Sequence, residues 1–208
     1  MRSSTLLLIL FLIGCSPSYK SIEVGDAGSK LTDFRREHIK SLVENEKAPL
    51  KKKDLKYLRF YDEKPQLNVL ALFRSNSDPE PFNMPTYSGR QKEFVRYGTA
   101  HFTLDGVNLT LDIFQNTRIL KIPGYKDHLF LPFKDVTNGE ATYGGGRYID
   151  MRTGDVDGDS IRIDFNRAYN PWCAYSDGFN CPIPPLNNHL PVAIEAGERN
   201  YTGPKRSQ

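Results

Sequence analysis

The sequence is poor in the residues from which metal centres, thiol chemistry and membrane spans are built. Its 208 residues include three cysteines, four histidines, three methionines and one tryptophan. No apolar run is longer than the eight residues 6–13, whereas a helix needs about 20 apolar residues to cross a bilayer. The composition therefore argues against a bundle of membrane-spanning helices and against a zinc-knuckle or Cys-x-x-Cys redox protein.

An excess of charge of one sign is missing too. Lys and Arg together number 28 and Asp and Glu number 25, which leaves a net charge of +3. Nucleic-acid-binding domains are typically strongly basic over one face. The basic run at residues 51–53 is followed at once by Asp54, as expected for a solvated turn. We expect no nucleic-acid partner.

The common catalytic signatures are also missing. The chain has no Gly-x-Ser-x-Gly and no His-Glu-x-x-His motif, and its histidines are scattered. Residues 155–159 carry three aspartates, but Gly158 comes too early for a calcium loop, before the third aspartate rather than directly after it, and the flanks are predicted to be strands rather than helices. We expect no metal site and no cofactor, and the sequence favours a non-catalytic protein.

The start of the chain predicts export. Arg2 precedes the short apolar run, and Leu12-Ile13-Gly14-Cys15 then resembles the lipobox of bacterial lipoproteins. The resemblance implies removal of residues 1–14 and lipidation of Cys15 with acyl chains such as palmitate, which attach the protein to a membrane. Ser16 in place of an aspartate favours the outer membrane of the cell envelope. A plain secretory signal with a coincidental cysteine is the alternative.

The two remaining cysteines, Cys173 and Cys181, form a natural pair in an exported protein. A disulfide closing this loop of about nine residues stabilises a fold by roughly 2.5 kcal/mol in the chain-entropy model. The competing use is a metal site with His189 or Asp177 as further ligands. Seven intervening residues differ from zinc-knuckle spacing, so we expect the disulfide.

The rest of the chain predicts one domain. Residues 15–30 are interpreted as a flexible tether, residues 31–201 as a single β-rich domain and residues 202–208 as a polar tail. Apolar residues at helical spacing predict a helix over residues 31–46, which Pro49 stops and whose apolar side packs on the domain.

Strand-like periodicity dominates after residue 55. Asp105-Gly106 between two alternating runs predicts a two-residue hairpin, with Leu104 opposite Val107 and Gly98 opposite Ile113. Further strands are expected at residues 58–61, 66–73, 119–122, 129–133 and 191–196, and residues 76–89 are expected to be a loop. Eight or nine strands with no helix between them predict an all-β fold, an antiparallel barrel or sandwich, with one N-terminal amphipathic helix.

A second hairpin is predicted to join residues 147–151 to residues 161–165. Pairing Met151 with Ile161 puts Arg147 on the apolar face, while Asp150 and Arg162 meet on the other. A buried arginine needs a partner, and the expected partners are Glu140, Glu195 and Glu198. Arg147 is then either a structural ion pair or an anion-binding group at the base of a cavity. The glycines before it indicate a bend or a close backbone approach.

The C-terminal third is similar to domain-of-unknown-function family 1684. The resemblance rests on residues 143–150 (Tyr-Gly-Gly-Gly-Arg-Tyr-Ile-Asp), 164–166 (Asp-Phe-Asn), 169–175 (Tyr-Asn-Pro-Trp-Cys-Ala-Tyr), 181–185 (Cys-Pro-Ile-Pro-Pro) and 195–198 (Glu-Ala-Gly-Glu). It covers about residues 31–201, and Trp172 replaces an expected smaller aromatic residue. The family has no assigned activity, so the resemblance implies no catalytic or binding role for any residue.

The leading hypothesis is a lipid-anchored, non-catalytic domain that binds a small polar ligand or an envelope partner. Aromatic rings mixed with Asp, Asn and Arg suit a carbohydrate or another polar ligand. One alternative is a hydrolase in which Arg147 holds an anion and Asp164, Glu195 or Glu198 transfers protons; another is a structural scaffold of the envelope. The predicted ligand-binding residues are Arg147, Tyr148, Asp164, Asn166, Tyr169, Trp172 and Tyr175.

Overall fold

The computed structural model describes residues 25–44 and 46–207. Within these residues the chain forms one sheet of eight strands, one α-helix and seven short 3-10 helices. The strands are β1 (Asn68–Ser75), β2 (Pro81–Pro85), β3 (Gln91–Leu104), β4 (Val107–Asn116), β5 (His128–Phe133), β6 (Arg147–Arg152), β7 (Val156–Asp157) and β8 (Ser160–Asp164). The helices are α1 (Gly25–Ser41), η1 (Lys52–Tyr57), η2 (Pro65–Leu67), η3 (Ile119–Lys121), η4 (Thr153–Asp155), η5 (Phe165–Arg167), η6 (Trp172–Ala174) and η7 (Leu186–Asn188). The predicted class, all-β with one N-terminal helix, is confirmed. The predicted leader and Cys15 lie outside the described residues.

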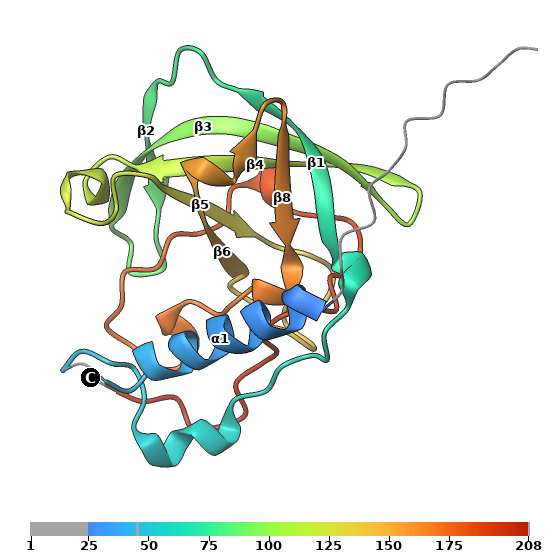
Figure 1. Cartoon of the computed structure of the whole chain (residues 1–208). Helices are drawn as coiled ribbons and strands as arrows, with labels where there is room; N and C mark the ends of the chain where they lie inside the picture. Colours follow the sequence, from blue (N-terminus) through green and yellow to red (C-terminus); the bar gives the residue numbers. More distant parts are fainter. Residues whose placement is uncertain (1–24, 45, 208) are drawn as a thin grey trace, which may run out of the picture.

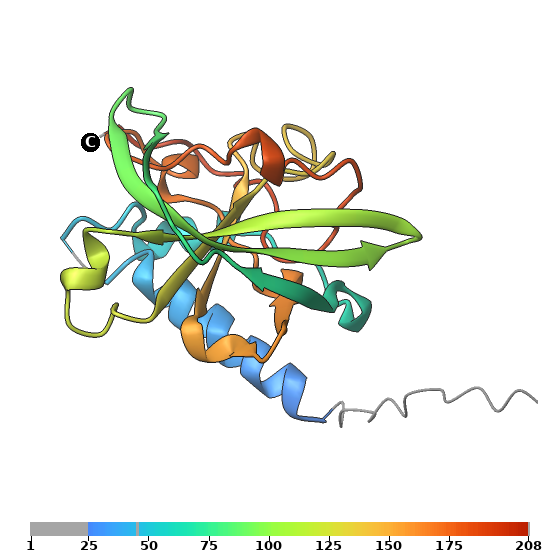
Figure 2. The same ribbon diagram turned by 90° about the horizontal axis from the view of Figure 1, so that it is seen from above.

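All strand pairs are antiparallel, in the order β6-β5-β4-β3-β1-β8-β7, with β2 added to β3. The long β3–β4 hairpin crosses the upper part of the molecule in Figure 1, and α1 lies below the sheet, with β6 and β8 between them. Figure 2, seen from above, shows α1 running beneath the strands rather than beside them. The helix thus covers the lower end of the sheet.

The β3–β4 hairpin has the predicted register. Leu104 is opposite Val107, Ala100 is opposite Leu111 and Gly98 is opposite Ile113. The turn residues Asp105 and Gly106 both have positive φ angles, 50° and 78°, as a two-residue hairpin of this kind requires. Turn chemistry and hydrophobic alternation agree here, which is why the pairing could be predicted.

One large cluster forms the core against the inner face of the sheet. It takes alternate residues from β1, β3, β4, β5, β6 and β8, so that Ile149 and Met151 of β6 belong to the same cluster as Ile161 and Ile163 of β8. Complete burial of such a side chain stabilises the fold by roughly 1.5–3 kcal/mol. Smaller clusters lie around Phe94 and around Tyr175.

The predicted hairpin between β6 and β8 is wrong. β6 pairs with β5 along its whole length, β8 pairs with β1, and the hairpin partner of β8 is the two-residue β7. Alternation determines which face a side chain takes, but it does not determine the neighbouring strand. The faces were therefore right: Met151 and Ile161 are both inside although they are not paired.

Three local predictions are corrected as well. The expected loop at residues 76–89 contains β2, which holds two prolines because it is an edge strand paired with β3 alone. Residues 119–122, expected as a strand, contain the 3-10 helix η3. Residues 191–196 form no strand; side chains bind this segment instead, as described below.

Helix α1 is confirmed with shifted bounds. It begins at Gly25, inside the segment interpreted as a tether, and ends at Ser41 rather than near Glu46. Leu42 follows it and packs against Leu50 and Tyr175, and the Leu50 N–H donates to the Leu42 carbonyl at 3.0 Å. The apolar side thus faces the domain as expected. None of the described helices is long and apolar enough to cross a membrane.

Candidate functional site: a groove between two sheet edges

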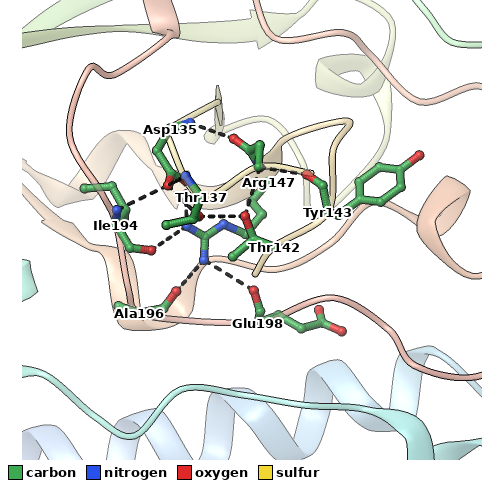
Figure 3. A network of polar contacts seen from close by, with 9 residues as sticks. Asp135, Thr137, Thr142, Tyr143, Arg147, Ile194, Ala196 and Glu198 are labelled. Atoms are coloured by element: carbon green, nitrogen blue, oxygen red, sulfur yellow. Dashed lines mark hydrogen bonds and ion pairs between the residues drawn. The ribbon is translucent and has the colours of Figure 1, made fainter. Parts of the chain in front are cut away.

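Arg147 is fully buried, and both of its terminal nitrogens are hydrogen-bonded, whereas its Nε has no partner among the described residues (Figure 3). Its Nη2 donates to Asp135 Oδ2 at 2.8 Å and to the Ile194 carbonyl at 2.7 Å, and its Nη1 donates to the carbonyls of Ala196 and Glu198. Burial lowers the pKa of the Arg147 guanidinium, and the Asp135 carboxylate opposes that shift. The predicted burial is confirmed, but the carboxylate partner is Asp135 rather than Glu140, Glu195 or Glu198.

The carboxylate of Glu198 points away from Arg147 in Figure 3 and makes a separate buried cluster. It accepts hydrogen bonds from the Tyr175 hydroxyl at 2.5 Å and from the Asn170 N–H at 2.9 Å, and His38 Nε2 lies 3.2 Å from it. Burial and then the charge of Glu198 raise the pKa of Tyr175 well above its ordinary value. The cluster ties α1, through His38, to the C-terminal segment.

The glycine run before β6 permits a close approach, as predicted. Gly146 has a φ of 90°, and a Cβ at this position would lie 2.7 Å from the Phe133 carbonyl oxygen. The chain can therefore enter β6 directly beside β5. Arg147 follows at once, and its guanidinium lies 5.2 Å from the centre of the Phe133 ring.

The predicted site residues do not share one cavity. Tyr148 is buried and donates to the Pro182 carbonyl, and Asn166 is buried and binds both backbone groups of Lys64. Trp172 packs edge-on against Phe179, with ring centres 5.0 Å apart. Asp164 accepts two hydrogen bonds from Asn166 and lines the groove described next. Tyr169 packs against Tyr148, with ring centres 5.9 Å apart, and donates to Asp150.

A groove of about 830 Å³ lies where β6 and β8 fail to meet, next to α1. We call it the seam groove. Its apolar walls are Leu31 and Phe34 from α1 and Ile149 and Met151 from β6. The figures show why these elements converge: both strands run down to the helix (Figure 1).

The sheet stays open here because another segment pairs with β6. Tyr148 exchanges two backbone hydrogen bonds with Tyr169, of 2.9 and 3.0 Å, on the side away from β5. The Arg152 N–H donates to Asp155 Oδ2 at 2.7 Å. Backbone groups alternate along a strand with a period of two, so Asp150, midway between these two, turns its N–H and C=O toward the groove.

Asp150 also presents its side chain at the groove. Its Oδ1 lies 2.9 Å from His128 Nε2, and its Oδ2 accepts from the Tyr169 hydroxyl at 2.8 Å, while 46% of the side chain remains exposed. Burial and then the charge of Asp150 raise the pKa of Tyr169 well above its ordinary value. Tyr169 therefore stays a donor at neutral pH, and the two contacts hold the carboxylate in one orientation while the side chain remains partly exposed.

The groove is rich in hydrogen-bond acceptors. Five carboxylates line it against three cations, and one of the cations, Arg167, lies 4.6 Å from the centre of the Phe34 ring. The Asn68 Oδ1 atom at its wall is buried and has no hydrogen-bond partner among the described residues. The carboxylates are Asp33, Glu37, Asp150, Asp155 and Asp164. Such a lining suits a ligand that carries hydrogen-bond donors and positive charge.

Sequence reasoning missed Asp135, His128 and Asn68. The feature that could have revealed them is the apolar run at residues 129–133. All side chains of this strand are buried, and such a strand must be covered by other elements on both faces. Pairing it with β6 places His128 opposite Arg152 and brings Asp135 beside Arg147. Asp150 and Arg162 were expected to face one another as a cross-strand pair; they share the seam groove without their strands being paired.

The cysteine prediction is confirmed: Cys173 and Cys181 form a disulfide with their Cα atoms 6.3 Å apart. His189 and Asp177 are therefore not joined to these sulfurs by a metal. Within residues 25–44 and 46–207, no three His, Cys, Asp or Glu side chains are grouped so that they could hold a metal ion.

Comparison with known proteins places the chain in a family. The family model "protein of unknown function (DUF1684)" matches residues 53–199. An uncharacterised protein of Haloarcula marismortui, whose solution NMR structure is known, is 35% identical, with a TM-score of 0.67; the match covers 84% of this chain and 94% of the other. No curated protein sequence matches significantly. The chain belongs to the family of proteins of unknown function DUF1684.

Proposed function

We propose that this protein is a lipid-anchored binding protein of the cell envelope, and that its seam groove holds a small organic ligand bearing an amine. The observation that carries the proposal is Asp150, whose carboxylate is fixed by His128 and Tyr169 and remains half exposed in the groove. A preoriented carboxylate loses little conformational freedom when it binds a cation, which improves affinity.

The dimensions and lining of the groove support a small ligand. Its volume of about 830 Å³ lies within the range of about 300–1,000 Å³ typical of small-molecule sites. Apolar walls from Leu31, Phe34 and Met151 would cover a carbon chain, and the acceptor-rich rim would bind its donors. An excess of carboxylates over cations favours an amine over a carboxylate or phosphate ligand.

The anchor rests on the sequence and on the disulfide. Residues 12–15 resemble a lipobox, and a structural disulfide such as Cys173–Cys181 belongs to oxidising compartments like the periplasm. In this proposal Cys15 carries the acyl chains, and Ser16 directs the protein to the outer membrane.

A matched pair of four-carbon probes tests the ligand. Isothermal titration of the protein with putrescine and with 1,4-butanediol compares two amines with two hydroxyls on the same chain. We expect putrescine to bind and butanediol to bind at least tenfold more weakly, because hydrogen bonds to charged groups contribute about 1.5–3 kcal/mol. Equal affinity for the two probes, or no heat with either, would contradict the amine assignment.

Two variants locate that binding. Asp150→Asn removes the charge and keeps the shape of the side chain, so it should abolish the preference for putrescine. Asp105→Asn is the control, because Asp105 lies in the β3–β4 turn at a φ of 50°, which Asn tolerates. A control that loses binding as strongly as Asp150→Asn would mean that putrescine responds to overall charge and not to the groove.

The anchor is tested separately in the bacterial host. Wild-type protein should fractionate with outer membranes, and its N-terminal peptide should carry acyl mass on Cys15. Cys15→Ser should release the protein into the soluble fraction while the isolated domain keeps its putrescine binding. An unacylated mature N-terminus would remove the anchor from the proposal and leave the groove untouched.

The geometry gives the two alternative functions less support. For a hydrolase, Arg147 is fully buried and engaged with Asp135 and three carbonyls, and Glu195 is on the surface, 2.8 Å from Lys64 Nζ. A pure scaffold would need no oriented carboxylate in an open groove. If no amine bound at Asp150, the scaffold function would be favoured instead.

A further inference from the structure

A second hollow lies beside the disulfide, apart from the seam groove. It has a volume of about 570 Å³, and we call it the disulfide pocket. One wall is the chain between the two cysteines, with Ser176, Asp177, Phe179 and Asn180. The opposite wall is the turn between β2 and β3 together with Tyr143, which precedes the glycine run. None of its lining residues lines the seam groove.

Internal contacts hold the two walls together. Thr86 and Ser88 of the β2–β3 turn both donate to Asn180 Oδ1, Ser88 at 2.6 Å. The Tyr87 hydroxyl donates to the Gly145 carbonyl at 2.9 Å. The disulfide fixes the ends of the Asn180 loop. These bonds preorganise the pocket before any ligand arrives.

The groups left unused in this pocket are donors. Among the described residues, the Tyr143 hydroxyl, the Arg90 guanidinium and the Asn180 amide nitrogen form no hydrogen bond with another group. Burial raises the pKa of Tyr143, so its phenol keeps its proton at neutral pH. The carboxylate of Asp177 is already paired with Lys205 at 2.7 Å. Three unused donors, beside a carboxylate that is already paired with a lysine, favour a ligand rich in acceptors.

The pocket also presents aromatic rings. Tyr87 is 42% exposed, and Tyr143 and Phe179 are partly exposed beside it. Flat rings next to amide and guanidinium donors can cover the C–H face of a pyranose while the donors bind its oxygens. Arg90 can in addition hold a carboxylate through two parallel hydrogen bonds.

We propose that the disulfide pocket binds an acidic sugar, with Arg90 on the carboxylate and Tyr143 and Asn180 on ring oxygens. This site is distinct from the seam groove and of opposite polarity. It would let the protein hold an anionic saccharide of the envelope independently of any amine ligand.

Methyl β-D-glucuronide and methyl β-D-glucoside test this proposal, because they differ at C6 alone. Amide NMR spectra of the labelled protein are recorded during titration with each sugar and with sodium acetate. We expect the glucuronide to shift the amides of residues 86–90 and 176–180, with at least tenfold weaker binding of the glucoside and of acetate. That ratio corresponds to one charge-assisted contact to Arg90.

Variants decide whether the pocket is responsible. Arg90→Gln should remove the preference for glucuronide over glucoside, whereas Arg118→Gln, an exposed arginine that lines neither hollow, should retain it. The proposal is overturned if the glucoside binds as well as the glucuronide, if acetate alone reproduces the shifts, if the shifts do not saturate, or if both variants lose binding equally. Putrescine binding in the groove is unaffected by any of these outcomes.

Discussion

The seam groove and the disulfide pocket are hollows of comparable size, about 830 and 570 Å³, but they arise differently. The groove lies where regular structure runs out: two strand edges fail to pair and a helix covers the gap. The pocket lies between irregular segments that a covalent bond and side-chain hydrogen bonds hold in place. The groove has acceptors at its rim, and the pocket has unused donors.

The two hollows share one connecting element. Residues 143–151 contribute Tyr143 to the disulfide pocket at one end and Ile149, Asp150 and Met151 to the seam groove at the other. Arg147 lies between them and fixes the chain to Asp135. The comparison indicates that a single buried residue supports both sites without lining either.

The largest expected effect comes from Arg147→Met, which should disturb both hollows. The change leaves Asp135 buried without its partner and several carbonyls without a donor, which costs about 3–5 kcal/mol of unfolding free energy. Urea denaturation measures this loss. Arg152→Met, on the exposed side of the same strand, removes a surface pair with Asp127 and should cost about 1 kcal/mol or less.

A second substitution separates the partners of Arg147. Adding Asp135→Leu to Arg147→Met removes the unpaired charge, so stability should recover in part. The carbonyls of Ile194 and Ala196 remain without a donor, so recovery should be incomplete. Complete recovery would mean that the carbonyls contribute little.

The next largest effect should fall on the disulfide pocket alone. Replacing Cys173 and Cys181 with Ser should lower the unfolding free energy by roughly 2.5 kcal/mol, the chain-entropy value for this loop length. Glucuronide binding should weaken, because Ser176, Asp177 and Asn180 lose their fixed loop, whereas putrescine binding should stay within twofold. Equal loss at both hollows would show that they are not independent.

A smaller effect is expected from Tyr169→Phe on the groove side. It deletes the hydroxyl that binds Asp150 Oδ2 and should cost about 1 kcal/mol of stability. Putrescine affinity should fall, because the carboxylate is then held by His128 alone. Tyr125→Phe is the control. The Tyr125 ring packs beside His128 and is 46% exposed, and removal of its hydroxyl should leave putrescine binding unchanged.

The smallest expected effect is a pH dependence of the unfolding free energy that comes from Tyr87 of the disulfide pocket. Burial raises the pKa of Tyr87 from 10.0 to about 12. The folded state therefore keeps the proton longer than the unfolded state, so this contribution to stability is present below pH 10 and is lost as pH rises toward 12. Tyr87→Phe should flatten the fall in urea midpoint over this interval. An unchanged slope would contradict the assigned shift.

The β3–β4 hairpin and the burial of Arg147 could be predicted because each depends on local information. A two-residue turn sets the first, and the alternation of residues 147–151 sets the second. The same alternation correctly placed Asp150 and Arg162 on the outer side. Alternation could not show that β6 pairs with β5. Several strands alternate in the same way, and no tight turn between β5 and β6 marks them as partners.

The candidate site was harder to predict for the same reason. Asp150 becomes notable because His128 arrives from β5 and Tyr169 from a segment after β8. The predicted set gathered motif residues from one stretch of sequence, and the fold distributed them among the core, the groove and loop contacts. Composition suggested a polar ligand; the positions of the donors and acceptors follow from tertiary pairing.

The way Arg147 binds residues 194–198 has a consequence for how this protein can vary. One guanidinium binds three peptide carbonyls of this segment, so it depends on the path of the backbone and not on the side chains there. Substitutions at solvent-facing Glu195 can then be accepted freely. Gly197 cannot be exchanged so easily, because its φ is 73° and a methyl group there would lie 2.5 Å from the Ala168 carbonyl oxygen.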